Sequence, residues 1–202
     1  WTEFLFWLKS KGLRGVRMFT SDAHEGIRYA MTTVFPTVPW QRCQYHFLKN
    51  IVEQVPKSYQ KGISSELTGM FNCSTIEDAI KKRDRIINDY SDIAEKAMDC
   101  LDRGFDSAMT VMLLPEELRV TFRTSNHLER LNKELKRRSK AIGIFPNVES
   151  LTRLMGAVML ERNEVIQQRV HPLFTKATYT KLLGLENELK KVAEEQQGMM
   201  VA

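Results

Sequence analysis

Hydrophobic and polar positions follow two different periods along the first 46 residues. Helical spacing over residues 1–12 gives way to a short, partly alternating run over residues 15–20, which predicts a strand. The pair Ser21-Asp22 suits the start of a helix over roughly residues 24–34, and a second short strand is expected over residues 40–43. Helices that alternate with short strands are typical of an α/β sheet with parallel strands.

The pattern then becomes helical without a convincing strand from residue 47 to about residue 118. The sequence Ser74–Glu77 has the form of a capping box, which predicts that a helix begins there. Further helices are expected from about residue 124 to residue 140, after Asn147, and over residues 176–197. We therefore expect an all-helical block after the sheet-forming segment.

The charged residues are distributed unevenly, with a basic excess in one segment of the chain. The 202 residues carry 30 Lys and Arg against 25 Asp and Glu, a net charge of +5. Residues 119–140 hold eight basic and two acidic residues, so this stretch carries 8 − 2 = +6 and the rest of the chain carries −1. A local basic patch indicates a polyanionic partner such as DNA, or it is simply a solvated helix face.

Composition excludes several classes of protein. An apolar fraction of 43% is enough to build a core, which argues against a disordered chain. No apolar run approaches the roughly 18 residues that a membrane span needs, so no membrane partner is expected. Three scattered cysteines do not form a disulfide framework and indicate a reducing compartment.

Two carboxylates stand at positions suited to chemistry. Asp22 follows an expected strand, where ligand sites collect in α/β sheets, but an aspartate there also caps helices well. Glu129 falls on the border of the apolar stripe defined by Leu128 and its helical neighbours, beside a cationic face. Glu129 could bind a metal ion there, or form an ordinary i,i+4 ion pair with Lys133.

Cys43 and His46 place a thiol and an imidazole three positions apart. A zinc site needs three or four protein ligands, and the remaining histidines and cysteines form no second pair of this kind. Cysteine nucleophilic catalysis lacks a third, orienting residue. We therefore assign Cys43 and His46 a structural role or a supporting role beside a site.

Two runs of residues together resemble one family. The first joins Asp22, Gly26-Ile27, Val34-Phe35-Pro36, Val38, Gln41, Cys43 and His46 at fixed spacing. The second is SNHLERLNKELKRR, Ser125–Arg138, followed by GIFPN at residues 143–147. Both runs, in this order, resemble the motifs of the Mutator-type transposases of bacterial insertion sequences, over about residues 1–160.

This resemblance implies a ribonuclease-H-like catalytic domain with an Asp-Asp-Glu triad, in which Asp22 matches the second Asp and Glu129 matches the Glu. It also implies Mg²⁺ as cofactor, with Mn²⁺ as substitute, held by these two carboxylates. The first Asp of such a triad would lie upstream of Trp1, so the chain is expected to be a fragment that is inactive alone. The candidates for contacts to DNA phosphates are Arg130, Lys133, Arg137 and Arg138.

The resemblance also divides the chain. We expect an α/β fold, here truncated and predominantly α-helical, with few short strands and a helical insertion. Residues 1–46 would form the later part of the ribonuclease-H-like core without its first strands, and residues 47–118 the insertion. Residues 119–170 would return to the core with the Glu-bearing helix and the helix after it, and residues 171–202 would form a helical tail.

The implied function is that of a DNA transposase that cleaves and joins strands at the ends of an insertion element. DNA at the element ends and at the target would be its partner, with a homodimer on DNA, in the bacterial cytoplasm. The alternative is a non-catalytic remnant of a transposase that keeps DNA binding or assembly without needing the carboxylates. A plain helical scaffold would explain residues 47–118 but neither motif.

Overall fold

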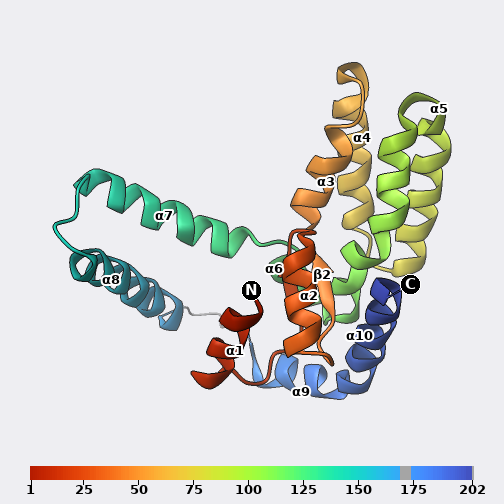
Figure 1. Cartoon of the computed structure of the whole chain (residues 1–202). Coiled ribbons are helices and arrows are strands. Elements are labelled where there is room, and N and C mark those ends of the chain that lie inside the picture. Colours follow the sequence, from red (N-terminus) through yellow and green to blue (C-terminus); the bar gives the residue numbers. More distant parts are fainter. Residues whose placement is uncertain (169–173, 202) are drawn as a thin grey trace. The chain divides into compact units, whose positions relative to one another are not determined.

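The computed structural model describes residues 1–168 and 174–201. Packing divides the chain into unit 1, Trp1–Thr124 with Thr178–Ala202, and unit 2, Ser125–Ala177. The first elements are α1 (Thr2–Ser10), β1 (Phe19–Ser21), α2 (Glu25–Val34), β2 (Trp40–Arg42), α3 (Gln44–Val52), α4 (Lys57–Phe71) and α5 (Ile76–Met109). They are followed by η1 (Thr110–Leu113), α6 (Glu116–Phe122), α7 (Asn126–Ile142), α8 (Val148–Gln167), α9 (Lys176–Gly184) and α10 (Glu186–Val201) (Figure 1).

β1 and β2 are the two strands of the described chain, and they pair in parallel with α2 as the crossover. The register joins Phe19 to Trp40 and Ser21 to Arg42. The predicted strand over residues 15–20 is thus shorter and later than expected, because a strand extends only as far as a partner can pair with it. Asp22 consequently lies directly beyond the carboxyl end of β1.

A helical bundle surrounds the largest core of unit 1. The backbone of Ala94 leaves helical geometry (φ −150°, ψ 56°), and the second arm of α5 returns beside the first (Figure 1). The two arms pack with α3 and α4 around Phe47, Ile63 and Leu101, which are fully buried. The helices predicted over residues 47–118 are therefore present, and their apolar faces share one core.

Close packing in this bundle depends on Gly104. A Cβ atom built at this position would lie 2.4 Å from Phe47 Cε2 and 2.5 Å from an Arg42 guanidinium nitrogen. Such distances are well inside van der Waals contact, so only glycine lets the second arm of α5 approach α3 and β2 this closely.

Two predicted helix ends needed correction. The N-cap of α5 is Thr75, whose hydroxyl accepts a hydrogen bond from the Asp78 N–H at 3.2 Å, and Ser74 of the predicted capping box lies one position too early. The single helix predicted over residues 176–197 is divided into α9 and α10 at Leu185. Gly184 directly precedes that break, and glycine is a poor residue for a helix interior.

α10 covers the outer edge of β2 within unit 1. The side-chain amide of Gln196 accepts from the Trp40 N–H at 2.8 Å and donates to the Trp40 carbonyl at 2.9 Å. This amide therefore satisfies both backbone groups that a further strand would pair with. Leu189 and Ala193 of α10 are buried in the same unit.

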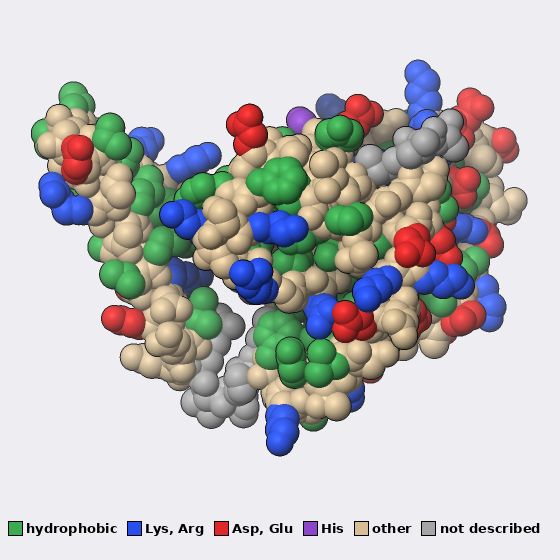
Figure 2. All heavy atoms as spheres, turned by 60° about the horizontal axis from the view of Figure 1, so that its bottom comes forward, with side chains coloured by type: hydrophobic (Ala, Val, Ile, Leu, Met, Phe, Trp, Pro, Cys, Tyr) green, Lys and Arg blue, Asp and Glu red, His purple; other side chains and the backbone are tan. Residues whose placement is uncertain are grey.

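Unit 2 is a hairpin of α7 and α8 with little core (Figure 1). No residue of α7 is buried, and Val158 is the buried residue of α8. Leu128, which the sequence places on a buried stripe, is 60% exposed, because two helices alone offer too little surface to cover it. Hydrophobic side chains accordingly lie on the surface of this hairpin, at the left of Figure 2.

Over the described residues, none of the helices has both the length and the apolar character needed to cross a bilayer.

Candidate functional site

Asp22 stands exposed at the carboxyl end of the two-stranded sheet in unit 1. The Cys43 N–H donates to the Ser21 carbonyl at 2.7 Å, which continues the pairing of the strands to the level of Asp22. In open parallel sheets this end is where ligands bind. The position predicted for Asp22 from the sequence is therefore the one that it occupies relative to β1.

The alternative role of Asp22 as a helix cap is wrong. The N-cap of α2 is His24, and no side chain caps that helix. Within the described part of the chain, the Asp22 carboxylate takes part in no hydrogen bond or ion pair. It is thus an exposed carboxylate that the structure of unit 1 leaves available for a ligand.

Cys43 links the sheet to α3. It is fully buried and is the N-cap residue of α3, and its carbonyl accepts from the Phe47 N–H at 2.9 Å. His46 lies in the first turn of the same helix and is half-buried, with its ring edge-on to Tyr45. These positions agree with a structural or supporting role for Cys43 and His46, which stays a prediction.

Two glutamine side chains that the sequence did not single out fix the end of α5. Gln41 is fully buried; its amide nitrogen donates to the Ala108 carbonyl at 2.7 Å, and its amide oxygen accepts from the Val111 N–H. Gln44 also donates to the Ala108 carbonyl, at 2.8 Å. Gln41 is a fixed position of the first motif, and this was the one sign in the sequence that its side chain has a role. The spacing of the motif does not reveal which backbone groups the amide binds.

The carboxyl end of the sheet also holds the segment that precedes α7. Thr20 Oγ1 donates to the Phe122 carbonyl at 2.7 Å, and the Gln44 N–H donates to the Arg123 carbonyl at 2.9 Å. The chain therefore leaves unit 1 directly after residues that are bonded to β1 and to the start of α3. Glu129 follows Arg123 by six positions in the sequence.

Glu129 lies in the first turn of α7, in unit 2, and is half-buried. Its carboxylate accepts a hydrogen bond from Ser125 Oγ at 2.6 Å. The alternative i,i+4 ion pair with Lys133 is not formed among the described contacts. Asp22 thus belongs to unit 1 and Glu129 to unit 2.

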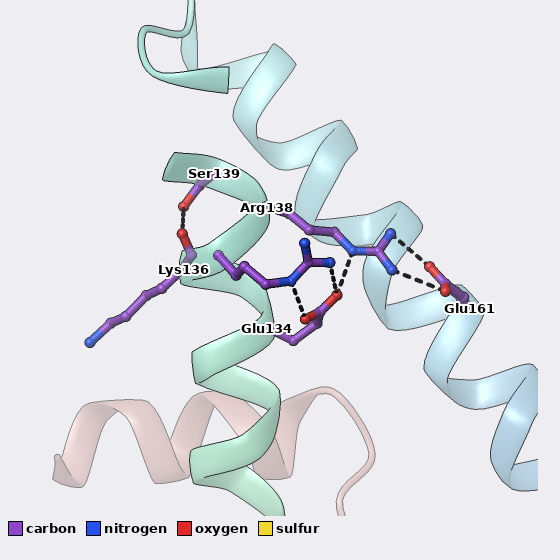
Figure 3. Close-up of polar contacts among 6 residues, drawn as sticks. Glu134, Lys136, Arg138, Ser139 and Glu161 are labelled. Carbon is purple, nitrogen blue, oxygen red and sulfur yellow. Dashed lines mark hydrogen bonds and ion pairs between the residues drawn. The ribbon is translucent and has the colours of Figure 1, made fainter. Parts of the chain in front are cut away.

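The four predicted DNA-binding residues separate into two pairs. Arg137 and Arg138 both donate to Glu134 at 2.8 Å, and these bonds lower the pKa of the Glu134 carboxyl to about 2. Arg138 also pairs with Glu161 of α8 at 2.8 Å, which ties the two helices together (Figure 3).

Arg130 and Lys133 form the other pair. Both are exposed on α7, and neither makes an ion pair with any residue that the structure describes. Their charges are therefore available to a polyanion, whereas part of the charge of Arg137 and Arg138 is already neutralised by Glu134.

Comparison with known proteins places these residues in a family. The model of the family described as "Transposase, Mutator family" matches residues 1–168. The chain is 39% identical over 166 residues to the transposase for insertion sequence element IS256 in transposon Tn4001 of Staphylococcus aureus, which covers 81% of this chain and 42% of that protein. It is 32% identical over 164 residues to the transposase for ISRM5 of Rhizobium meliloti, which covers 81% of this chain and 41% of that protein.

A third relative, the transposase for IS1081 of Mycobacterium tuberculosis, is 30% identical over 164 residues, which covers 81% of this chain and 40% of that protein. The chain spans about two fifths of the length of these relatives. The family match includes Asp22, Glu129 and the basic residues of α7. On this evidence, the chain belongs to the Mutator family of transposases.

Proposed function

We propose that this chain is the part of a DNA transposase that supplies Asp22 and Glu129 to metal-dependent strand cleavage and strand transfer. The observation that carries the proposal is the state of Asp22: an exposed carboxylate, without a described partner, at the carboxyl end of a parallel strand. A carboxylate kept there for stability would cap α2 or form an ion pair, and Asp22 does neither.

The side chains fit a hard divalent cation. Mg²⁺ and Mn²⁺ prefer carboxylate oxygens, and Mg²⁺ completes its ligand shell with water and substrate phosphate. Asp22 offers an exposed carboxylate, and Glu129 offers a half-buried one that Ser125 orients. When bound, such a cation would supply Lewis-acid stabilisation of charge on the phosphate that is attacked.

The chain's own residues have separable roles in this proposal. Asp22 and Glu129 hold the cation, and the Ser125 hydroxyl donates a hydrogen bond to the Glu129 carboxylate. Arg130 and Lys133 bind DNA phosphates, because their charges are not paired within the described chain. Arg137 and Arg138 bind DNA less strongly, since Glu134 competes for them.

Further parts of the proposal rest on the family resemblance. The parallel unit of β1, α2 and β2 supports a ribonuclease-H-like fold. No residue among these 202 matches the first Asp of the triad, so we expect the isolated chain to lack strand cleavage. A homodimer on DNA in the bacterial cytoplasm completes the proposed setting.

The test is a calorimetric titration of the chain with Mn²⁺. Asp22→Asn and Glu129→Gln should each abolish the same saturable binding event, and the double variant should lose nothing more, because both carboxylates serve one site. Asp92→Asn, which removes an exposed carboxylate of α5, is the matched control and should bind as the wild type does. Unchanged affinity in Asp22→Asn or Glu129→Gln would remove that residue from the site.

A further inference from the structure

Unit 1 contains a cavity of ≈ 750 Å³ that the proposed chemistry does not use. Its walls come from β2, the second arm of α5, η1 and α10, and Ala23, the neighbour of Asp22, also lines it. Four arginines of unit 1 face this space: Arg28, Arg42, Arg103 and Arg119.

Arg28 and Arg42 are held in place by aromatic rings. The Arg28 guanidinium carbon lies 4.5 Å from the centre of the Trp40 ring, and that of Arg42 lies 4.3 Å from the centre of the Phe47 ring. A guanidinium over an aromatic ring is attracted by the ring face, and this contact does not use its N–H groups as hydrogen-bond donors to an anion.

Neither arginine has its charge paired at ion-pair distance in the described chain. No carboxylate forms an ion pair with Arg28 or Arg42, and Arg28 Nε is buried without a hydrogen-bond acceptor. Burial lowers the pKa of both arginines; Glu25 partly offsets this for Arg28, and for Arg42 the Cys100 thiol offsets it while the charge of Arg28 adds to it. Desolvated like charges side by side are unfavourable unless an anion compensates them.

The other charged groups around the cavity do not supply that anion. Three carboxylates line it, so the lining carries four positive and three negative charges, but none of these acids pairs with an arginine of the cavity; they are Asp106, Glu188 and Glu195. Arg119 donates to the carbonyls of Leu114 and Ser74, and Arg103 donates to the carbonyl of Asp99. Arg28 and Arg42 therefore remain the two cations in need of a ligand.

We propose that this cavity binds a phosphate group between Arg28 and Arg42. Phosphate suits the pair because a planar guanidinium donates two parallel hydrogen bonds to its oxygens. Pockets of roughly 300–1,000 Å³ hold small ligands, so a volume of ≈ 750 Å³ is in the range for a phosphate-bearing ligand larger than the phosphate ion.

The walls of the cavity extend beyond the part of the chain that the family model matches. Glu188, Val192 and Gln196 belong to α10, whereas the match ends at residue 168. The phosphate could belong to the DNA backbone or to a free nucleotide or phosphate ion. Both sources share the same chemistry, and competition between them can be measured.

The experiment is a calorimetric titration of the full chain with inorganic phosphate. We expect saturable binding that weakens about tenfold or more in Arg28→Gln and in Arg42→Gln, because each variant removes a charged donor. Arg85→Gln is the matched control: Arg85 is an exposed arginine of α5 outside the cavity, and its loss should leave the affinity unchanged.

Circular dichroism establishes that each variant is folded. If Arg42→Gln does not fold, Arg28→Gln is the variant that tests the proposal. Arg28 is half-exposed and contacts one face of the Trp40 ring, so its replacement should disturb the core less. Absence of saturable phosphate binding to the wild type, or wild-type affinity in folded Arg28→Gln, would overturn the proposal.

A short DNA duplex added to the phosphate complex identifies the source. Displacement of phosphate by DNA assigns the cavity to the DNA backbone, and retention of phosphate assigns it to a small phosphate ligand; either result keeps the site. Asp22→Asn should bind phosphate as the wild type does, so this site and the proposed metal site can fail independently.

Discussion

The bundle of unit 1 and the hairpin of unit 2 are built on different interactions. In the bundle, α3, α4 and both arms of α5 bury a continuous apolar cluster, and residues such as Phe47 and Leu101 have no exposed surface. In the hairpin, α7 buries no residue, and Ile144 is 91% exposed. The ion pair of Arg138 with Glu161 connects α7 to α8, and Glu134 holds the Arg138 side chain from within α7.

This difference means that the residues that stabilise the fold and the residues proposed to bind DNA lie in different segments of the chain. Burial of apolar surface is the dominant stabilising contribution in folding, whereas exposed ion pairs contribute little. Unit 1 therefore supplies a rigid base for Asp22, and unit 2 presents Glu129 and a cationic helix face on an element with little stability of its own. Substitutions in the bundle should change stability, and substitutions on α7 should change binding.

The largest expected effect is that of Phe47→Ala. Removing a fully buried ring from the bundle should lower the free energy of unfolding by about 3–5 kcal/mol, measured by chemical denaturation. Leu128→Ala in unit 2 is the control and should change it by less than about 0.5 kcal/mol. Equal losses from both variants would contradict the difference in burial between Phe47 and Leu128.

A smaller loss is expected from Gln41→Leu. The substitution leaves the buried Val111 N–H without its acceptor, although the Ala108 carbonyl keeps its bond from Gln44. The free energy of unfolding should fall by about 1–3 kcal/mol. Gln54→Leu, at an exposed glutamine of unit 1, should leave the denaturation midpoint in place; a similar fall there would argue against the buried bonds as the cause.

Binding to DNA should distinguish the two pairs of basic residues on α7. Arg130→Gln and Lys133→Gln should each weaken binding and reduce the salt dependence of the affinity by a slope of about 0.9, the value for one lost phosphate contact. Arg138→Gln should change the slope less, because Glu134 and Glu161 already occupy that side chain. Fluorescence anisotropy over a series of salt concentrations measures these slopes, and a larger change from Arg138→Gln than from Lys133→Gln would reverse the assignment.

The smallest effect concerns pH. The Glu134 carboxyl has a pKa of about 2 in the folded chain against an ordinary value of 4.5, because Arg137 and Arg138 donate to its charged form. Its contribution to stability is therefore complete above pH 4.5 and is lost as the pH falls through about 2. Carboxyl NMR should show this midpoint, and Arg137→Gln should move it upward; a midpoint near 4.5 in the wild type would mean that the ion pairs are absent in solution.

The sequence predicted the elements that local signals define. Gly143, with φ at 78°, ends α7 where expected, and Asn147 caps α8 by accepting from the Ser150 N–H. The bend at Ala94 was not predicted, because no glycine or proline marks it and the apolar period continues through it. Tertiary packing, which pairs the two arms of α5, decides that position.

The sequence predicted which residues belong to the candidate site, but it did not predict most of the hydrogen bonds and ion pairs that these residues form. Asp22 was expected beyond a strand, and the structure places it there without the capping role. The pairing of Arg137 and Arg138 with Glu134 was missed, because the net charge of a stretch does not say which charges neutralise each other. The amide of Gln41 was missed for a similar reason, since the carbonyl that it binds is 67 positions away.

The central claim is that Asp22 and Glu129 hold one divalent cation between them. The most direct measurement is an NMR titration of the chain with Mn²⁺, whose unpaired electrons broaden the signals of nearby nuclei. The signals of residues next to Asp22 and next to Glu129 should broaden together at the same Mn²⁺ concentration, and Asp22→Asn should abolish both effects. Broadening around only one of the two carboxylates, or persistence around Glu129 in Asp22→Asn, would contradict a shared site.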